Sequence, residues 1–91
     1  MKDVISGIVA SDEASFRRFY DRYRPKIYTV ALKLLGEKTL AEDVVQDTFL
    51  KVWINKESLP TIENVEAWLH RIAKNVILNM MKKAEYYKVY A

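Results

Sequence analysis

The sequence contains no cysteine among its 91 residues. This absence excludes a disulfide framework and a thiolate metal site, and it fits a reducing compartment. No apolar run approaches the ~20 residues of a membrane-spanning helix, and the apolar stretch VISGIVA near the N-terminus is too short for an export signal. We therefore expect a soluble, cytoplasmic protein.

Glycine and proline are also scarce, with two of each, and no stretch alternates apolar and polar residues for long enough to form a sheet. These shortages predict an all-α fold. Hydrophobic residues make up 51% of the chain, which supports a packed core and argues against disorder. At this length we expect one domain over residues 1–91, folded as a compact bundle of three to four helices.

The first half of the chain carries signals for two helices. Residues 2–9 form a short one, and Ser11 or Asp12 caps the next. Pro25 falls inside the second helix and predicts a kink or break, because proline removes a backbone hydrogen bond; Gly36 ends the helix. The apolar residues expected to face the core from it are Phe16, Phe19, Tyr20, Tyr23, Ile27, Val30, Ala31, Leu34 and Leu35.

Two further helices are expected in the second half. The residues TLAE at 39–42 read as a capping box that starts a helix ending near Ile54. Residues 55–63 form a polar loop stiffened by Pro60, and Asn64 caps the last helix. The side chains that this helix turns inward are Val65, Leu69, Ile72, Ala73, Val76 and Met80.

The third expected helix has an acidic side although the chain carries a net charge of +3. At about 100° per residue, one side gathers apolar and small residues and the opposite side gathers acidic ones with two aliphatics. Apolar groups among charges favour a contact surface, because they gain from being covered. A solvated face with incidental aliphatics is an equal alternative. The inward set is Ala41, Val45, Thr48 and Val52, and the outward set is Asp43, Gln46, Asp47, Leu50 and Ile54.

The last helix is basic, with five basic residues and one acid after Trp68. Cations, amides and an aromatic ring on one helix face are the groups that hold phosphates and splayed bases. A solvated lysine-bearing face behind a buried Trp68 explains the pattern at least as well. The outward residues are Arg71, Lys74, Asn75, Leu78 and Lys82, with Trp68 and Asn79 at the edge.

Three motifs together resemble a known family. FRRFYDRYRPKIYTVALKLLG, AEDVVQDTFLKVW and AWLHRIAKN, in this order and spacing, are similar to region 2 of bacterial extracytoplasmic-function (ECF) sigma factors of the sigma-70 family. The resemblance implies a helical domain that binds the clamp coiled coil of the RNA polymerase β′ subunit. It also implies recognition and opening of the minus-ten promoter element. On this reading the polymerase-binding residues are Asp43, Gln46, Asp47 and Leu50.

The resemblance also assigns a promoter DNA side. Trp68, Arg71 and Asn75 fall on its WL-x-R-I-A-x-N motif, and residues 55–63 correspond to the segment that captures a base of the non-template strand. Asn79 departs from the family pattern, in which an aspartate is usual at this position. Lys82 and Lys83 stand where arginines are usual, and lysine lacks the planar guanidinium that makes bidentate hydrogen bonds. The full set of predicted DNA-binding residues is Lys56, Ser58, Thr61, Trp68, Arg71, Lys74, Asn75, Asn79 and Lys82.

A full member of this family continues into a second domain, region 4, so we expect this chain to be an excerpt in which residues 86–91 begin the linker. An anti-sigma factor is an expected further partner. We expect no enzyme, no cofactor and no metal site, since the single histidine, His70, has no second ligand nearby and no nucleophile accompanies the carboxylates. The main alternative is a helical interaction adaptor that does not open promoters.

Overall fold

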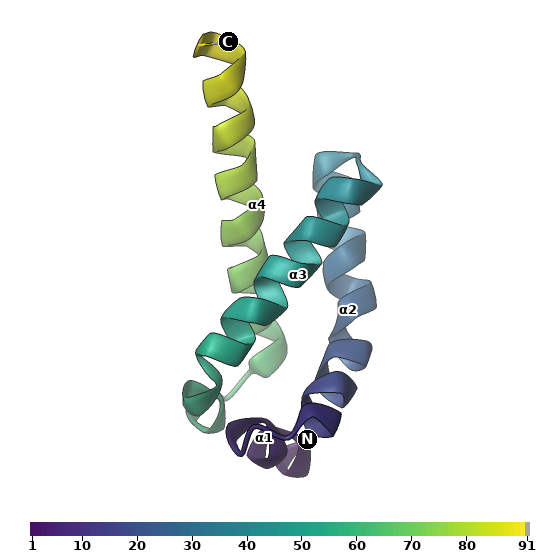
Figure 1. Cartoon of the computed structure of the whole chain (residues 1–91), viewed down its shortest axis with the longest axis vertical. Coiled ribbons are helices and arrows are strands. Elements are labelled where there is room, and N and C mark those ends of the chain that lie inside the picture. Colours follow the sequence, from purple (N-terminus) through teal and green to yellow (C-terminus); the bar gives the residue numbers. More distant parts are fainter. Residues whose placement is uncertain (91) are drawn as a thin grey trace.

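A computed structural model describes residues 1–90, and the side chains of residues 1–84. The described chain forms four α-helices and one 3-10 helix (Figure 1). No strand occurs in this range, so the all-α prediction is confirmed. None of the described helices is long and apolar enough to cross a membrane. The elements are α1 (Lys2–Val9), α2 (Glu13–Leu35), α3 (Lys38–Ile54), η1 (Lys56–Thr61) and α4 (Val65–Tyr90).

Both ends of α2 follow the local sequence signals. The Asp12 carboxylate accepts hydrogen bonds from the Ala14 backbone N–H at 3.3 Å and from the Ser15 hydroxyl at 2.7 Å. The bond from Ser15 lowers the pKa of Asp12, because it stabilises the charged form. At the other end Gly36 adopts a left-handed φ of 75°, which a glycine accepts without steric cost. The predicted limits of this helix are therefore confirmed.

Pro25 does not divide α2. The helix runs without interruption from Glu13 to Leu35, and the residues on either side of the proline, Tyr23 and Ile27, are buried in the core. Packing of these flanking residues offsets the hydrogen bond that Pro25 removes. The predicted break is therefore wrong, and a bend within the continuous helix stays a prediction.

The predicted capping box at Thr39 is also wrong. α3 begins at Lys38, so Thr39 already lies inside the first turn, and the cap position is Glu37, whose side chain makes no cap hydrogen bond. The reason is the preceding turn. Since Gly36 ends α2 in the left-handed conformation and Glu37 is extended, at φ −130° and ψ 131°, the chain re-enters a helix immediately. The predicted end near Ile54 is confirmed.

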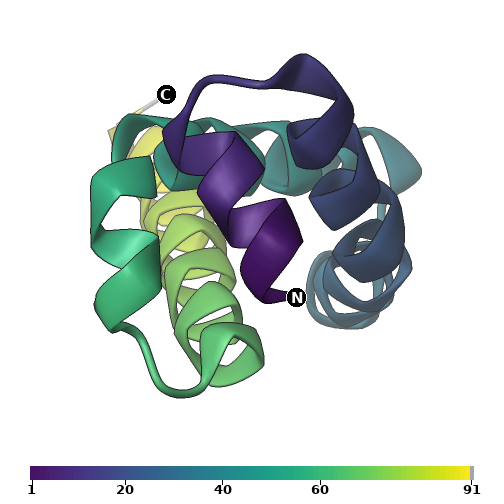
Figure 2. The same cartoon turned by 90° about the horizontal axis from the view of Figure 1, so that it is seen from below.

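The hydrophobic core lies where α2, α3 and α4 pack on one another, and α1 and η1 lie together at one end of the molecule (Figures 1 and 2). An aromatic cluster joins α2 to α3, with Phe49 of α3 4.8 Å from Tyr20 and 6.0 Å from Phe19 between ring centroids. Two core predictions need correction. Leu34 is 51% exposed because it lies in the last turn of α2, whereas Ile77, which the inward set of α4 omitted, is buried.

The expected polar loop at 55–63 is more ordered than predicted. Its central residues form η1, and the Leu59 side chain is completely buried, with 0% exposure. Leu59 and Ile62 are the only aliphatic residues of this segment, too few to give a periodicity, so the sequence pattern does not reveal that Leu59 anchors it. Asn64 caps α4 as predicted, by accepting a hydrogen bond from the Ala67 N–H at 3.0 Å.

Thr48 gives a test of the core. Its side chain is fully buried, and its hydroxyl has no hydrogen-bond partner in the described part of the chain. We expect Thr48→Val to raise the free energy of unfolding by about 1 kcal/mol, because valine keeps the shape and removes a desolvated hydroxyl. Urea unfolding followed by circular dichroism measures this. Thr29→Val is the matched control without a gain, since the exposed Thr29 hydroxyl donates to the Pro25 carbonyl at 2.8 Å. A loss of stability in Thr48→Val would contradict the assignment.

Candidate functional site

The acidic face of α3 consists of Asp43, Gln46, Asp47 and Leu50. All four side chains are exposed, while the predicted inward set of the same helix is buried, so the helical-wheel prediction is confirmed. Leu50 is 55% exposed, a large fraction for an apolar residue between charges. Among the described side chains no hydrogen bond or ion pair engages Asp43, Gln46 or Asp47. Their polar groups are therefore available to a partner.

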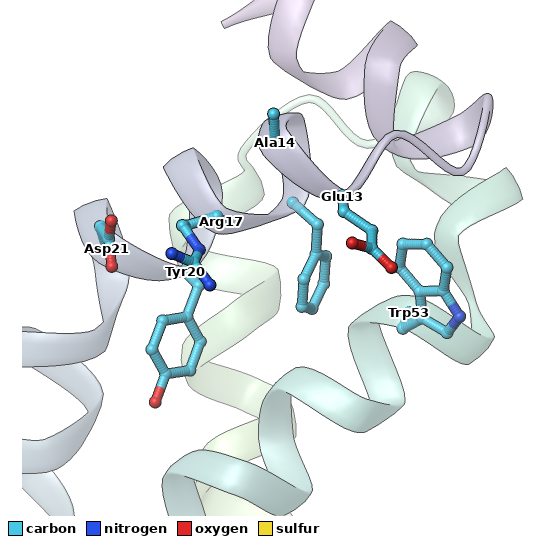
Figure 3. A pocket seen from close by; sticks show the side chains of 7 residues that line it. Glu13, Ala14, Arg17, Tyr20, Asp21 and Trp53 are labelled. Carbon is cyan, nitrogen blue, oxygen red and sulfur yellow. The ribbon is translucent and has the colours of Figure 1, made fainter.

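The acidic face borders an aromatic groove formed by Phe16, Tyr20, Phe49 and Trp53, between the start of α2 and α3. A first hollow of about 800 Å³ is lined by three of these rings together with charged residues of α2 (Figure 3). A second hollow of about 300 Å³ is lined by all four rings and by Gln46 and Leu50. The acidic face and the aromatic groove thus form one continuous surface. The sequence pattern placed Phe16 and Tyr20 in the core, because helical spacing does not show which rings stay partly open.

The basic face of α4 consists of Arg71, Lys74, Asn75, Asn79 and Lys82, all of which are exposed. Trp68 is partly buried and packs against the core, so only part of its ring is accessible. The neighbouring Leu78 is 52% exposed. The structure thus gathers the predicted residues of α4 on one side of a single helix and on a different helix from the acidic face.

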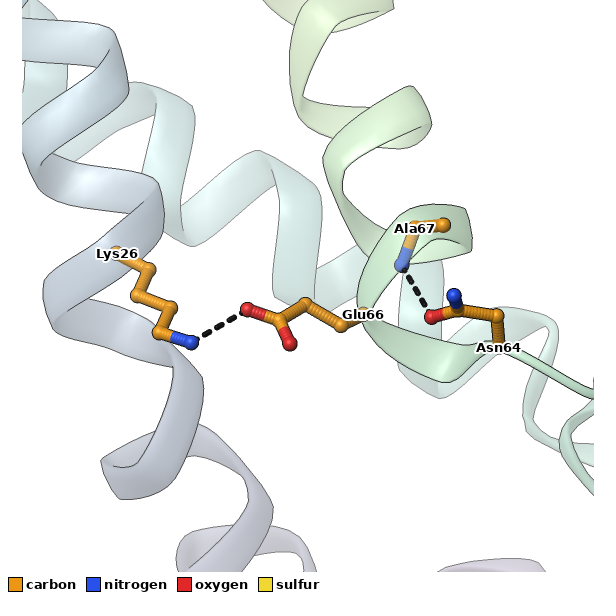
Figure 4. A network of polar contacts seen from close by, with 4 residues as sticks. All are labelled: Lys26, Asn64, Glu66 and Ala67. Carbon is orange, nitrogen blue, oxygen red and sulfur yellow. Dashed lines mark hydrogen bonds and ion pairs between the residues drawn. The ribbon is translucent and has the colours of Figure 1, made fainter.

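The start of α4 is fixed by polar contacts (Figure 4). Asn64 caps the helix, and Glu66 in the first turn forms an ion pair with Lys26 of α2 at 2.5 Å. The hydrogen bond from Lys26 lowers the pKa of the Glu66 carboxyl. A lowered pKa in the folded state means that this link is present at neutral pH and is lost as the pH falls through that pKa. Through the ion pair, the first turn of α4 is linked to α2.

η1 presents the predicted residues unequally. Ser58 and Thr61 are exposed, and the Thr61 hydroxyl donates to the Ser58 carbonyl at 2.6 Å. Lys56 is only half exposed, and its ammonium donates to the Ser11 hydroxyl at 2.5 Å. The same nitrogen lies 4.0 Å from the centroid of the Trp53 ring. Ser58 and Thr61 are thus presented outward, whereas Lys56 is held against the protein.

No group of three His, Asp or Glu side chains in the described residues lies close enough to hold a metal ion. The described surfaces are an acidic face beside an aromatic groove, and a basic face on another helix. Residues 19–86 match the family Sigma-70 region 2, and the chain belongs to this family.

Curated relatives agree with this assignment. The chain is 35% identical to the ECF RNA polymerase sigma factor SigL of Mycobacterium tuberculosis over 86 residues, which cover 93% of this chain and 49% of SigL. It is 32% identical to the ECF RNA polymerase sigma factor SigW of Bacillus subtilis over 89 residues, covering 96% of this chain and 48% of SigW. The chain therefore spans about half the length of these relatives. The predicted resemblance to ECF sigma factors is confirmed.

Proposed function

We propose that this chain acts in transcription initiation as region 2 of an ECF sigma factor, which binds core RNA polymerase and recognises and opens the minus-ten promoter element. The observation that carries the proposal is the presence of two exposed faces of opposite character on one helical core, in a chain of the Sigma-70 region 2 family. One face suits a basic protein surface, and the other suits a phosphate backbone.

The polymerase side is proposed to be the acidic face together with the aromatic groove. Asp43, Gln46 and Asp47 supply charges and an amide for basic groups of the β′ clamp coiled coil, which favours encounter and register. Leu50 stands where the groove meets the acidic face, so an apolar side chain of the clamp can be buried there. Apolar anchors surrounded by polar groups are the arrangement from which interfaces draw most of their affinity.

The promoter side is proposed to be the basic face of α4 with η1. Arg71 and Lys74 neutralise phosphates, and Asn75 donates to a phosphate or a base edge. The accessible part of the Trp68 ring offers a stacking surface for a base. Ser58 and Thr61, exposed on η1, offer hydroxyls to a base turned out of the stack, which stays out only if new contacts replace its lost stacking and pairing.

We propose further that residues 1–91 are one module of a longer sigma factor whose region 4 lies elsewhere, and that the protein acts in the cytoplasm, where an anti-sigma factor is a further partner. α4 extends through Tyr90. The expected linker start at residues 86–91 therefore falls largely within this helix, and Ala91 lies outside the described residues.

The proposal is tested by binding of a single-stranded minus-ten oligonucleotide to this chain in complex with core polymerase. A sigma domain prefers particular bases at particular positions. The alternative function, an interaction adaptor with a basic face, shows only salt-sensitive attraction that is indifferent to sequence. Equal affinity for minus-ten oligonucleotides and for scrambled ones of the same length would contradict promoter recognition and favour the adaptor.

Lys74 provides a quantitative prediction for the basic face. We expect Lys74→Ala to reduce the slope of log affinity against log salt concentration by about 0.7–0.9, because one phosphate contact and its released counterion are lost. Fluorescence anisotropy with labelled DNA over a salt series measures the slope. Lys33→Ala is the matched control, since Lys33 is also exposed but lies in the last turn of α2. If Lys74→Ala leaves the slope as unaltered as Lys33→Ala does, Lys74 touches no phosphate.

A further inference from the structure

We propose that Lys56 and Ser11 form a strut that holds η1 against the turn between α1 and α2. Lys56 is then a positioning residue, and residues that never touch DNA set the placement of the base-reading segment. The consequence for base selection rests on the proposed function, whereas the strut itself concerns the fold alone.

The Lys56 ammonium is engaged on two sides. It donates a hydrogen bond to the Ser11 Oγ, 45 positions away in the sequence, at 2.5 Å. It also lies over the Trp53 ring, 4.0 Å from the centroid, where the negative face of the π-system attracts a cation. Both contacts turn the charge toward the protein. A lysine held in this way fixes the first residue of η1 rather than reaching for a phosphate.

Ser11 is placed to receive this bond by an unusual backbone. Its φ is 65°, in the left-handed region that favours glycine, and it is the only described non-glycine residue with a positive φ. The turn closes by hydrogen bonds from the Ser11 N–H to the Ile8 carbonyl at 2.9 Å and from the Asp12 N–H to the Gly7 carbonyl at 2.8 Å. A serine in this conformation contributes a hydroxyl that a glycine would lack.

The turn is closely packed on both sides. α1 approaches the start of α2 so closely that a Cβ at Gly7 would lie 1.9 Å from the Ser15 Oγ. α1 also packs against η1 (Figure 2), and Ile8 of α1 and Leu59 of η1 are both completely buried in the core. η1 is thus held from within by Leu59 and at its start by Lys56. Ser58 lies between these two attachments, and Thr61 lies two residues after Leu59.

The first arm of the test measures amide hydrogen exchange of residues 56–62 in the 91-residue chain. Ser11→Gly removes the hydroxyl and tolerates the positive φ, and Lys56→Met removes the charge and keeps the apolar stem. We expect Ser11→Gly to accelerate exchange in η1 by about fivefold and Lys56→Met by at least as much, because Lys56→Met also removes the contact over the Trp53 ring. The double variant is expected to equal Lys56→Met alone, since the bond to Ser11 is already lost there. Urea unfolding of each variant separates this local opening from global unfolding. Lys51→Met, at an exposed lysine of α3, is the control without an effect.

Unchanged exchange in both variants, or an effect of Lys56→Met alone, would overturn the strut. The second arm measures base preference with a library of single-stranded minus-ten oligonucleotides on the polymerase complex. We expect both variants to shift base preference in the same way and to leave the salt slope unchanged. A slope that falls by about 0.7 in Lys56→Met but not in Ser11→Gly would make Lys56 a direct phosphate contact and overturn the positioning role.

The two arms keep the strut and the proposed function apart. Faster exchange combined with unaltered base preference would also overturn the positioning role. If the unsubstituted complex shows no base preference at all, promoter recognition fails, and the exchange result still decides whether the strut holds η1.

Discussion

Truncating Gln46 and Leu50 together to alanine is expected to weaken binding of core RNA polymerase by roughly 30- to 1,000-fold, from about 1–2 kcal/mol for each side chain at a packed interface. Both side chains line the smaller hollow of the aromatic groove, where polar and apolar contacts meet. Because both are exposed on α3, their loss leaves the core intact and helicity unchanged. A titration of core polymerase with labelled protein, together with circular dichroism, measures both properties.

Leu34→Ala is a matched control for the loss of an exposed leucine, since Leu34 is 51% exposed and Leu50 is 55% exposed, but Leu34 lies in the last turn of α2. Its polymerase affinity is expected to equal that of the unsubstituted chain.

Asp43→Lys is expected to reduce polymerase affinity more than Asp43→Ala, because it places like charge against a basic clamp. If the Gln46 and Leu50 double variant binds as tightly as the Leu34 control, the acidic face is not the polymerase surface.

Phe49→Ala is expected to lower the free energy of unfolding by about 3–5 kcal/mol. Phe49 is 2% exposed, and its ring lies 4.8 Å from that of Tyr20, 6.0 Å from that of Phe19 and 6.5 Å from that of Phe16. Removing it leaves Phe19 and Tyr20 of α2 without their aromatic partner on α3, whereas Phe16 keeps the Trp53 ring at 5.1 Å. For a domain of this length the total stability is on the order of 5–14 kcal/mol, so the loss is a large share of it.

Urea unfolding of both proteins at several temperatures measures this loss of stability. Phe49→Leu keeps most of the apolar volume and is expected to lose less than half as much free energy of unfolding. A loss below about 1 kcal/mol in Phe49→Ala would show that α2 and α3 hold together without this ring. Since Phe49 also lines the groove, its effect on polymerase binding is interpretable only at temperatures where the variant remains folded.

Local signals in the sequence determined the fold class, most helix limits and the character of both faces. Asp12 and Asn64 cap their helices with their own side chains, and Gly36 ends α2 with its own backbone freedom, so neighbours within a few residues suffice to predict them. The outward residues of α3 and α4 follow from helical periodicity, because side chains three or four positions apart share a side. The three sequence motifs were also sufficient to identify the family to which the chain belongs.

Contacts between distant residues decided the rest. Pro25 stays inside α2 because the core packs on both sides of it. The aromatic groove depends on how α2 and α3 meet, and the bond from Lys56 to Ser11 joins residues 45 positions apart. Periodicity records which side of a helix is apolar and not which neighbour covers it. The partner of each side chain was therefore determined only by tertiary packing.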